Sequence, residues 1–526
     1  MAPVEDLGTY DVIIIGAGMS GLMAANVLAQ QGWRALLIEK GTGPGGCTVN
    51  FQRKGFRFDA STHLINGCES GGSIYEELRK VGAEDRVEFV KLQTLMDWTD
   101  DARGISTQLP VALPAYVDTL SQLYPHEEKG IREFYRRYES VAKLLLSNSG
   151  TSESEQAALF MQHPEVMQDF AALQGKSAKD IVDRYVSDPD LIEMMTILTG
   201  LFGLGYDEID AFLFVMADLG YRLEGAYYPK GGSGYVSEVL ADLFEARGGT
   251  ILLDHQVTSL SLSDGLVDGV VMRRPKGQEF AASARTIVAA SDLTALVSEL
   301  CPPGALAPEF IEKIEERVPC VSAVILYAGI DFDLRERGIT GYEIHRTWGE
   351  LSSSELVNEI ATTGDYSRLP SGNATVYSNV DPGCCPEGKS LISTLAYATP
   401  ELFEGALDRG WRRGRTYGAL KQKITDQLLE KMARTLGIPD LADHVEVIEL
   451  ATPVTLKRYT SNRGGSFVGW SITPGQGVFN AIPQQSPVPN LFLCGQWVFP
   501  GGGVAPAMMS GSGAAELADA YLKKKG

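Results

Sequence analysis

Residues 11–40 read DVIIIGAGMSGLMAANVLAQQGWRALLIEK and contain the local pattern that decides the fold. Residues 11–15 end in a run of β-branched apolar side chains, which is typical of a strand buried on both faces. Glycines follow at positions 16, 18 and 21, and apolar residues then recur at helical spacing until Gly32. Residues 34–38 predict a second strand that ends at Glu39. The stretch therefore predicts a strand, a glycine turn, a helix and a second strand with an acid at its end.

The spacing of the three glycines is that of a dinucleotide-binding turn. Gly16 makes the tight turn, Gly18 lets the backbone approach a pyrophosphate, and Gly21 lets helix and strand pack closely. The free N–H groups at the positive end of the helix would meet the phosphates. Glu39 can accept hydrogen bonds from ribose hydroxyls, and its charge would repel a 2′-phosphate. The predicted site residues of this unit are Gly16, Gly18, Met19, Ser20, Gly21, Glu39 and Lys40.

A second glycine cluster indicates which dinucleotide binds. Gly45-Gly46-Cys47 follows the acid closely and resembles the extension of two-dinucleotide-binding flavoproteins, where the backbone passes close to FAD. Residues 231–234 could open a second dinucleotide unit, but residues 227–230 contain Pro229 and predict a poor central strand. The chain has no CxxC motif, so a disulfide reductase is not expected. We therefore expect one dinucleotide, FAD, and no separate nicotinamide domain.

Composition excludes several classes of protein. The chain has 526 residues, a net charge of −21 and seven cysteines. Such acidity argues against nucleic-acid binding, and sparse cysteines argue against a disulfide scaffold or a zinc ribbon. Residues 1–10 do not resemble a signal peptide, and the apolar stretches 191–205 and 211–219 are too short to span a membrane. We expect a cytoplasmic protein, with a membrane surface left open as a partner and the oligomeric state undecided.

Four segments carry a family resemblance: residues 11–47, residues 56–67 (FRFDASTHLING), residues 228–257 and residues 490–504. They resemble the phytoene desaturase, carotenoid isomerase and retinol saturase superfamily of flavoproteins, which is akin to the amine oxidases. Ser61 stands where that family often has glycine. The resemblance implies that the Val257 backbone contacts adenine and that Gly495, Gln496, Gly503 and Val504 lie at the flavin.

The last segment also has a chemical reason to lie there. A strand at 491–493 precedes a glycine run and a helix expected from about 504 to 522. The N-terminus of that helix, pointed at the flavin pyrimidine edge, would stabilise the negative charge that develops in hydride transfer. Cys494 lies just before this turn, where covalent flavin attachment is conceivable but not expected.

Histidine usage predicts no metal site. The six histidines form no pair with metal-ligand spacing. His63 alone lies in a flavin-adjacent motif, where it is a candidate proton donor or acceptor, and the alternative is a histidine that packs or bonds to the backbone. Asp59 is expected to order the local backbone.

The predicted fold class is α/β: a Rossmann-like FAD-binding domain of the two-dinucleotide-binding type with a discontinuous α+β substrate domain. The FAD-binding domain takes residues 1–70, 225–300 and 450–526, and the substrate domain takes residues 71–224, mostly helical, and 301–449. Further strands are expected at 251–257, 286–290 and 321–330, helices at 235–247 and 420–436, and a loop at 147–154.

Two apolar segments each allow two interpretations. Residues 191–223 are rich in Leu, Met and Phe and would line a substrate tunnel or form ordinary core, which is favoured. Residues 131–145 mix Arg and Lys with aromatic residues and would lie on a membrane surface or, as favoured, form a solvated face over a core stripe.

The predicted function is an FAD-dependent oxidoreductase acting on carbon–carbon bonds of a long hydrophobic substrate such as a carotenoid, retinoid or other isoprenoid lipid. Desaturation, cis–trans isomerisation and saturation all remain open. One alternative is an amine oxidase-like flavoenzyme with an aromatic cage beside the flavin, for which Trp497 is a candidate. The other is a non-catalytic flavin-binding partner protein.

Overall fold

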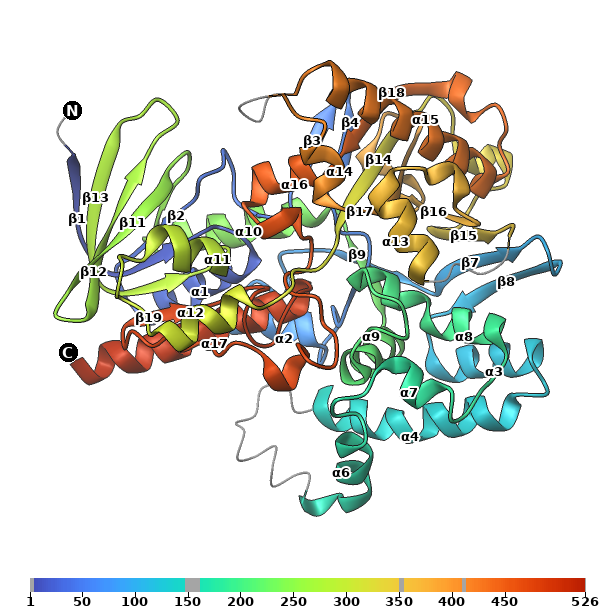
Figure 1. The fold of residues 1–526 in the computed structure, drawn as a ribbon, viewed down its shortest axis with the longest axis horizontal. Coiled ribbons are helices and arrows are strands. Elements are labelled where there is room, and N and C mark those ends of the chain that lie inside the picture. The colour runs from blue at the N-terminus through green and yellow to red at the C-terminus, as the bar shows by residue number, and fades with distance from the viewer. Residues whose placement is uncertain (1–3, 147–160, 350–353, 409–412, 526) are drawn as a thin grey trace.

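The computed structural model describes residues 4–146, 161–349, 354–408 and 413–525, and the predicted loop at 147–154 lies outside them. Figure 1 shows a sheet near both termini on one side, and a second sheet above a layer of helices on the other.

The strand before the glycine turn lies inside a seven-stranded sheet. β1 (Glu5–Ile15) lies between β2 (Ala35–Ile38) and β13 (Glu279–Ala289) and runs parallel to both. α1 (Met19–Gln30), α10 (Ser233–Ala246) and α17 (Val504–Lys525) share one apolar core with these strands. The remaining strands of the sheet are β10 (Thr250–Leu252), β11 (Gln256–Ser263), β12 (Leu266–Arg273) and β19 (Leu491–Leu493). The βαβ unit, the returning strand near 286–290 and the C-terminal helix are thus confirmed.

The single strand expected at residues 251–257 is wrong. The chain forms β10, parallel to β2, and then β11, antiparallel to β12, and it turns between them at Asp254 with φ of 58°. In this turn Asp254 N donates to Gly41 O and His255 N donates to Glu39 O, both at 2.9 Å. The apolar run predicted extended backbone, but nothing in it predicted the left-handed conformation of Asp254.

The weak strand expected at residues 227–230 is also corrected. β9 (Ala226–Pro229) is the central strand of a three-stranded sheet, between β5 (Ile65–Asn66) and β6 (Phe89–Leu92). Both neighbours are antiparallel to β9, so this strand is not part of a second parallel βαβ unit. The glycines that follow it open α10, whose N-cap is Gly232.

The second seven-stranded sheet has the order β18-β14-β17-β16-β15-β7-β8. Its strands are β18 (Val445–Ala451), β14 (Ser322–Ile330), β17 (Ser390–Ala398), β16 (Ser371–Val376), β15 (Glu343–Thr347), β7 (Thr94–Asp100) and β8 (Ile105–Pro110). α13 (Ser354–Thr363), α14 (Pro400–Glu404) and α15 (Arg415–Leu436) share an apolar core with it. The strand expected at 321–330 and the helix expected at 420–436 are confirmed. β6, β7 and β8 were not predicted in the mostly helical stretch 71–224.

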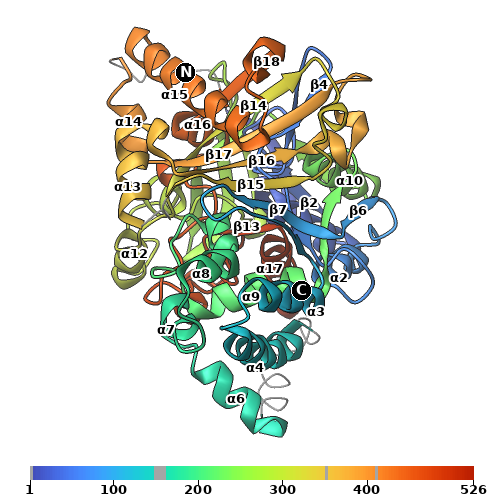
Figure 2. The same cartoon turned by 90° about the vertical axis from the view of Figure 1, so that its right-hand side faces the viewer.

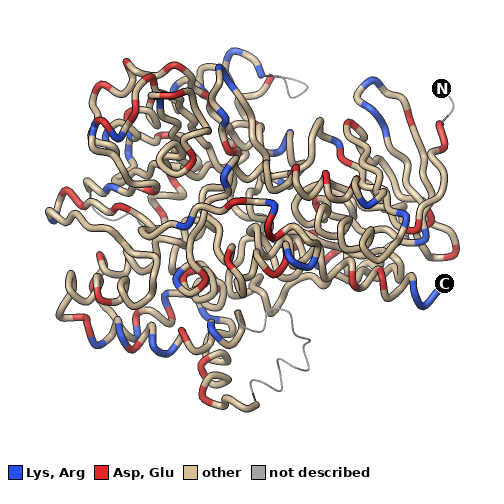
Figure 3. The backbone as a smooth tube through the Cα atoms, turned by 180° about the vertical axis from the view of Figure 1, so that it is seen from behind, with Lys and Arg blue, Asp and Glu red and all other residues tan. Residues whose placement is uncertain are grey.

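A layer of helices lies below this sheet (Figure 2). It contains α3 (Leu113–Leu123), α4 (Glu128–Leu146), α6 (Pro164–Ala171), α7 (Ala178–Val182), α8 (Pro189–Thr196), the 3-10 helix η1 (Ile197–Phe202) and α9 (Ala211–Glu224). Within it, α4 buries Ile131, Phe134 and Tyr138, while Arg136 pairs with Glu133 on the outside. Figure 3 shows both signs of charge along this helix. The solvated face over a core stripe therefore describes α4.

The division of the chain into two domains at 70/71 and 300/301 stays a prediction. α2 (Ser73–Lys80) packs against α17, and its buried Ile74 and Leu78 belong to the core beneath the first sheet. α12 (Pro308–Glu315) likewise contributes Ile314 to the core on the other face of that sheet.

Candidate active site

One continuous cavity of about 2140 Å³ connects the first sheet with the second sheet and the helical layer. Ordinary small-molecule pockets measure roughly 300–1,000 Å³, so this cavity has room for a cofactor and a further ligand. Fifteen of the predicted site residues line it: Gly16, Gly18, Met19, Ser20, Glu39, Lys40, Gly45, Gly46, Cys47, His63, Val257, Gly495, Gln496, Gly503 and Val504.

Gly21 does not line the cavity, and it packs instead. A Cβ at this position would stand 1.9 Å from Gly16 O and 3.2 Å from the Ala290 Cβ. Only a glycine therefore lets α1 approach the ends of β1 and β13. This is the packing role that its place in the motif predicts.

The two glycine clusters meet at the N-terminus of α1. Gly18 and Gly45 form an isolated parallel bridge, and Gly45 N donates to Ala17 O at 2.7 Å. A Cβ on Gly18 would find no heavy atom nearer than the Gly46 Cα at 4.0 Å, so no protein atom requires a glycine there. No side chain caps α1, and its first turn has no acid. This end of the helix therefore offers open N–H groups to an anionic phosphate.

Glu39 is 9% exposed and already accepts two backbone hydrogen bonds. Its Oε2 accepts from Ala17 N at 2.8 Å, and its Oε1 accepts from Gly41 N at 2.7 Å. A carboxylate has about four lone-pair sites, so two remain for ribose hydroxyls. Glu39 thus orders the glycine turn and also lines the cavity, where its remaining lone pairs can accept from a ribose.

Lys40 connects the first sheet to α16 (Pro453–Thr460). Its Nζ donates to Arg458 O at 3.3 Å and to the Ser461 hydroxyl. Burial lowers the pKa of Lys40, and the neighbouring Glu39 partly opposes that shift. The sequence motif gave no indication of this contact, because 418 residues separate Lys40 from Arg458.

A second helix N-terminus faces the same cavity. α17 begins at Val504 after Gly501 and Gly503, which have φ of 123° and 117°, and its first turn has no acid. Gly495 lies close by, and a Cβ there would come within 3.1 Å of the Ser20 hydroxyl. Cys494 is 2% exposed, and burial raises the pKa of its thiol to about 12. The thiol is therefore protonated near neutral pH and gives no support to covalent attachment.

His63 lines the cavity and is held by a carboxylate from the second sheet. Its Nδ1 lies 2.9 Å from Glu343 Oε1, and Thr375 Oγ1 donates to Glu343 Oε2 at 3.1 Å. Burial lowers the pKa of His63, but the adjacent Glu343 carboxylate outweighs that effect and holds the pKa above its ordinary value. The histidine side chain is 28% exposed and that of Glu343 5% exposed. His63 can therefore carry and exchange a proton at the cavity surface.

Tyrosine hydroxyls fix the backbone around His63. They donate to four carbonyl oxygens between residues 60 and 64: Tyr327 to Ala60 O, Tyr377 to Thr62 O at 3.3 Å, Tyr342 to His63 O at 2.5 Å and Tyr221 to Leu64 O at 3.1 Å. Asp59, at the start of this segment, accepts from Ser233 N at 2.6 Å and from Thr62 N at 3.0 Å. Asp59 thus orders the backbone, as its position predicts.

The far part of the cavity has an apolar wall from the helical layer. We call Leu198, Leu201, Phe202, Phe212, Leu213 and Met216, from η1 and α9, the apolar wall. Other residues of the stretch 191–223, such as Met194, Met195 and Phe214, are buried core. The stretch thus contains both cavity-lining residues and ordinary core, and the substrate role of the cavity-lining residues stays a prediction.

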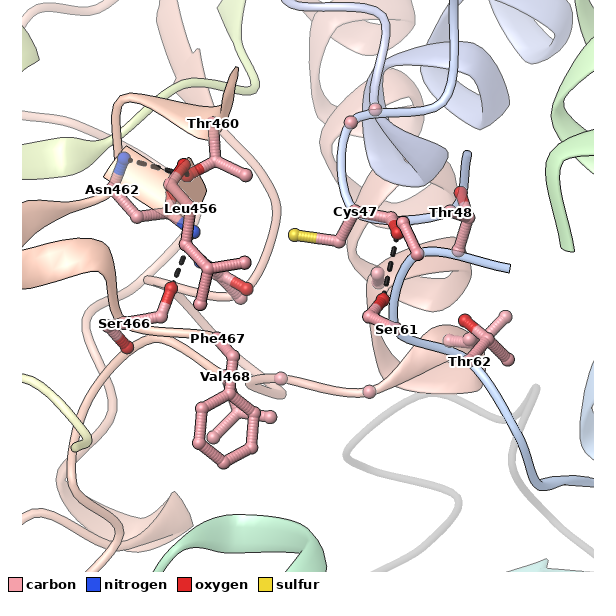
Figure 4. Close-up of a pocket in the computed structure, with 18 of the residues that line it drawn as sticks. Cys47, Thr48, Ser61, Thr62, Leu456, Thr460, Asn462, Ser466, Phe467 and Val468 are labelled. Atoms are coloured by element: carbon pink, nitrogen blue, oxygen red, sulfur yellow. Dashed lines mark hydrogen bonds between the residues drawn. The ribbon is translucent and has the colours of Figure 1, made fainter. Parts of the chain in front are cut away.

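Figure 4 shows one part of the cavity. Cys47 and Ser61 lie on one side, and the turn after α16, with Asn462, Ser466 and Phe467, lies on the other. Sequence reasoning missed this second side, since residues 461–468 match no glycine motif.

The comparisons with known proteins agree with this geometry. A model of the family described as flavin-containing amine oxidoreductases matches residues 19–518. The chain belongs to that family. Its cofactor is FAD, and the open turn at Gly18, the carboxylate of Glu39, the uncapped N-terminus of α1 and the acid-free first turn of α17 fit a dinucleotide with a flavin at its far end.

Three relatives are similar over nearly the whole chain. Prolycopene isomerase 1 from an Oncidium hybrid cultivar is 26% identical, with 99% of this chain and 86% of the relative covered. All-trans-retinol 13,14-reductase from Danio rerio is 25% identical, with 94% and 82% covered. 4,4′-Diapophytoene desaturase from Staphylococcus aureus is 23% identical, with 95% and 96% covered. The predicted superfamily is therefore confirmed.

A solved structure supports the fold. A putrescine oxidase variant superposes with a TM-score of 0.65 over 100% of both chains, at 14% identity. At this identity the likeness concerns the fold of this flavoprotein family alone.

The described residues contain neither a cluster of metal ligands nor a membrane-spanning helix. No group of three or more His, Cys, Asp or Glu side chains in the described ranges could hold a metal ion. Within the same ranges, no helix is long and apolar enough to cross a membrane.

Proposed function

We propose that this flavoprotein acts on carbon–carbon bonds of a long, apolar polyene. The observation that carries the proposal is the continuity of the cavity from the dinucleotide site at α1 and α17 to the apolar wall. The names of the relatives support the same substrate class, because they include an isomerase of prolycopene, a reductase of retinol and a desaturase of diapophytoene.

FAD, when bound, supplies the hydride-transfer chemistry that these reactions need. The residues of the chain then bind and orient the substrate, and they exclude water from it. The apolar wall removes water from the polyene, and the positive end of α17 stabilises negative charge that develops in front of Val504. His63, positioned by Glu343 and by the tyrosine hydroxyls behind it, is the candidate that moves a proton at its free ring nitrogen.

Amine oxidation is the competing function, since the family description names amines. It requires an aromatic surface that is open to a cationic substrate. Trp497 is 3% exposed, and its ring packs edge-on against Trp470 with the centroids 4.7 Å apart. This packing favours the polyene proposal over an amine cage built on Trp497.

The test is anaerobic mixing of the FAD-loaded protein with a polyene in detergent micelles or with putrescine, followed by flavin absorbance and product analysis. One flavin reduced per polyene indicates desaturation. Turnover only after prior reduction, without net use of reductant, indicates isomerisation, and reductant consumed one for one indicates saturation. Rapid flavin reduction by putrescine with no change in any polyene would replace the proposal with amine oxidation.

A further inference from the structure

The second sheet brings a cluster of polar side chains to the cavity, beside Ile325 and Leu395 of the same sheet, although the proposed substrate is a polyene. Five side chains of β15, β16 and β17 line the cavity, and we call them the polar wall: Glu343, His345, Asn373, Thr375 and Ser393. Strand register places them on one face, because Glu343 pairs with Thr375, Thr375 with Ser393, and His345 with Asn373.

The polar and apolar walls belong to one space. Tyr397 of β17 donates from its hydroxyl to Gly200 O of η1 at 2.6 Å, so the second sheet and the helical layer meet beside the cavity. Leu201 and Phe202 follow Gly200 directly on the apolar wall. A ligand in this space therefore contacts hydrocarbon on one side and hydrogen-bonding groups on the other.

The polar wall retains unused hydrogen-bonding capacity. His345 Nε2 lies 3.1 Å from Thr347 Oγ1, and the ring stacks on Trp98 at 4.4 Å between centroids. Burial lowers the pKa of His345 to about 4, so the ring is neutral near pH 7 and can form one further hydrogen bond through Nδ1. Asn373 Nδ2 donates to Leu395 O at 3.0 Å, which leaves its second amide hydrogen. Among the described residues, no partner is found for either group, nor for Nε2 of His63.

A pure hydrocarbon in this space would cover those groups without replacing the hydrogen bonds they make to water. That loss opposes binding, because buried polar groups without partners are costly. A hydroxyl or carbonyl oxygen on the ligand would satisfy them. The carboxylate of Glu343 in the same row disfavours an anionic group.

We infer that the substrate is an amphipathic polyene with a neutral oxygen function, and that His345 and Asn373 of the polar wall bind this oxygen. The inference rests on the proposed function, since it specifies which polyenes the cavity accepts. It makes His345 and Asn373 specificity-determining residues, distinct from His63 at the proton step.

The experiment measures Kd by quenching of protein fluorescence with the FAD-loaded protein and two matched ligands. The ligands are all-trans-retinol and the same polyene with hydrogen in place of the hydroxyl group. We expect retinol to bind about tenfold more tightly, because its oxygen pairs with His345 and Asn373, which the hydrocarbon would leave without partners. Equal or tighter binding of the hydrocarbon would overturn the inference and leave the proposed function standing.

Substitutions show which residues produce the preference for retinol. Asn373→Leu and His345→Phe should reduce the preference for retinol to less than about threefold by weakening retinol binding alone. Met216→Leu, on the apolar wall and nearly equal in volume, should leave the preference unchanged. An unchanged preference in both polar-wall variants would show that these residues do not bind the oxygen. If neither polyene binds the wild-type protein, the proposed function fails as well.

Discussion

Substitution of Glu39 tests the dinucleotide site quantitatively. Its carboxylate accepts from Ala17 N at 2.8 Å and from Gly41 N at 2.7 Å, and it has lone pairs left for the ribose. Each charge-assisted hydrogen bond contributes about 1.5–3 kcal/mol. Glu39→Ala should therefore weaken FAD binding by at least tenfold, at about 1.4 kcal/mol per factor of ten. It should also lower the free energy of unfolding of the apoprotein, because two buried N–H groups lose their acceptor.

These two effects are separated by a cycle of ligand and protein changes. FAD and its 2′-deoxyadenosine analogue are titrated into apoprotein, and Kd is measured by flavin fluorescence. Wild-type protein should bind the deoxy analogue about tenfold more weakly, while Glu39→Ala should bind both ligands equally, because the lost partner is the same. The exposed Glu315, changed to Ala, is the control and should behave as wild type. If Glu39→Ala keeps the full preference for FAD over the deoxy analogue, Glu39 does not contact the ribose.

Three further experiments test other parts of the site. Gly18→Ala should leave the Tm of the apoprotein nearly unchanged but impair FAD binding. Gly21→Ala should instead destabilise the apoprotein by several kcal/mol, because its Cβ would stand 1.9 Å from Gly16 O. Calorimetry and FAD titration of both variants check this. The raised pKa of His63 means that its pairing with Glu343 stabilises the fold fully below about pH 6.5, the unfolded value, and that this stability is lost as pH rises through the folded pKa. Urea unfolding across pH 5–9 should show that step in wild type and not in Glu343→Gln, and a step of equal size in both would exclude the pair as its source. Leu201→Gln should weaken polyene binding while FAD content stays at the wild-type level, and loss of FAD instead would place the apolar wall at the cofactor.

The dinucleotide half of the site could be predicted because its determinants are local. The glycine spacing at 16, 18 and 21 dictates where a backbone can approach a ligand, and the acid after the second strand follows within the same unit. The same holds for α17, whose glycine-lined start lies at Val504, where the sequence placed it.

The other half of the site depends on contacts between distant segments. Glu343 reaches His63 across 280 residues of sequence, and Asn373 joins the polar wall only through the register of β15 with β16. Alternating patterns predict a strand but not its neighbours, so neither residue could be assigned to the cavity beforehand. The break between β10 and β11 was also not predicted. A single left-handed residue, Asp254, creates it, and the hydrophobic pattern does not reveal that conformation.

We propose that a single cavity holds FAD at one end and a polyene between the apolar and polar walls at the other. A crystal structure of the FAD-loaded protein soaked with all-trans-retinol measures this most directly. We expect pyrophosphate density at the N-terminus of α1, and polyene density between Leu201 and Asn373 with its conjugated chain facing the flavin ring. Retinol density outside this cavity, or a flavin ring away from Val504 and His63, would contradict it.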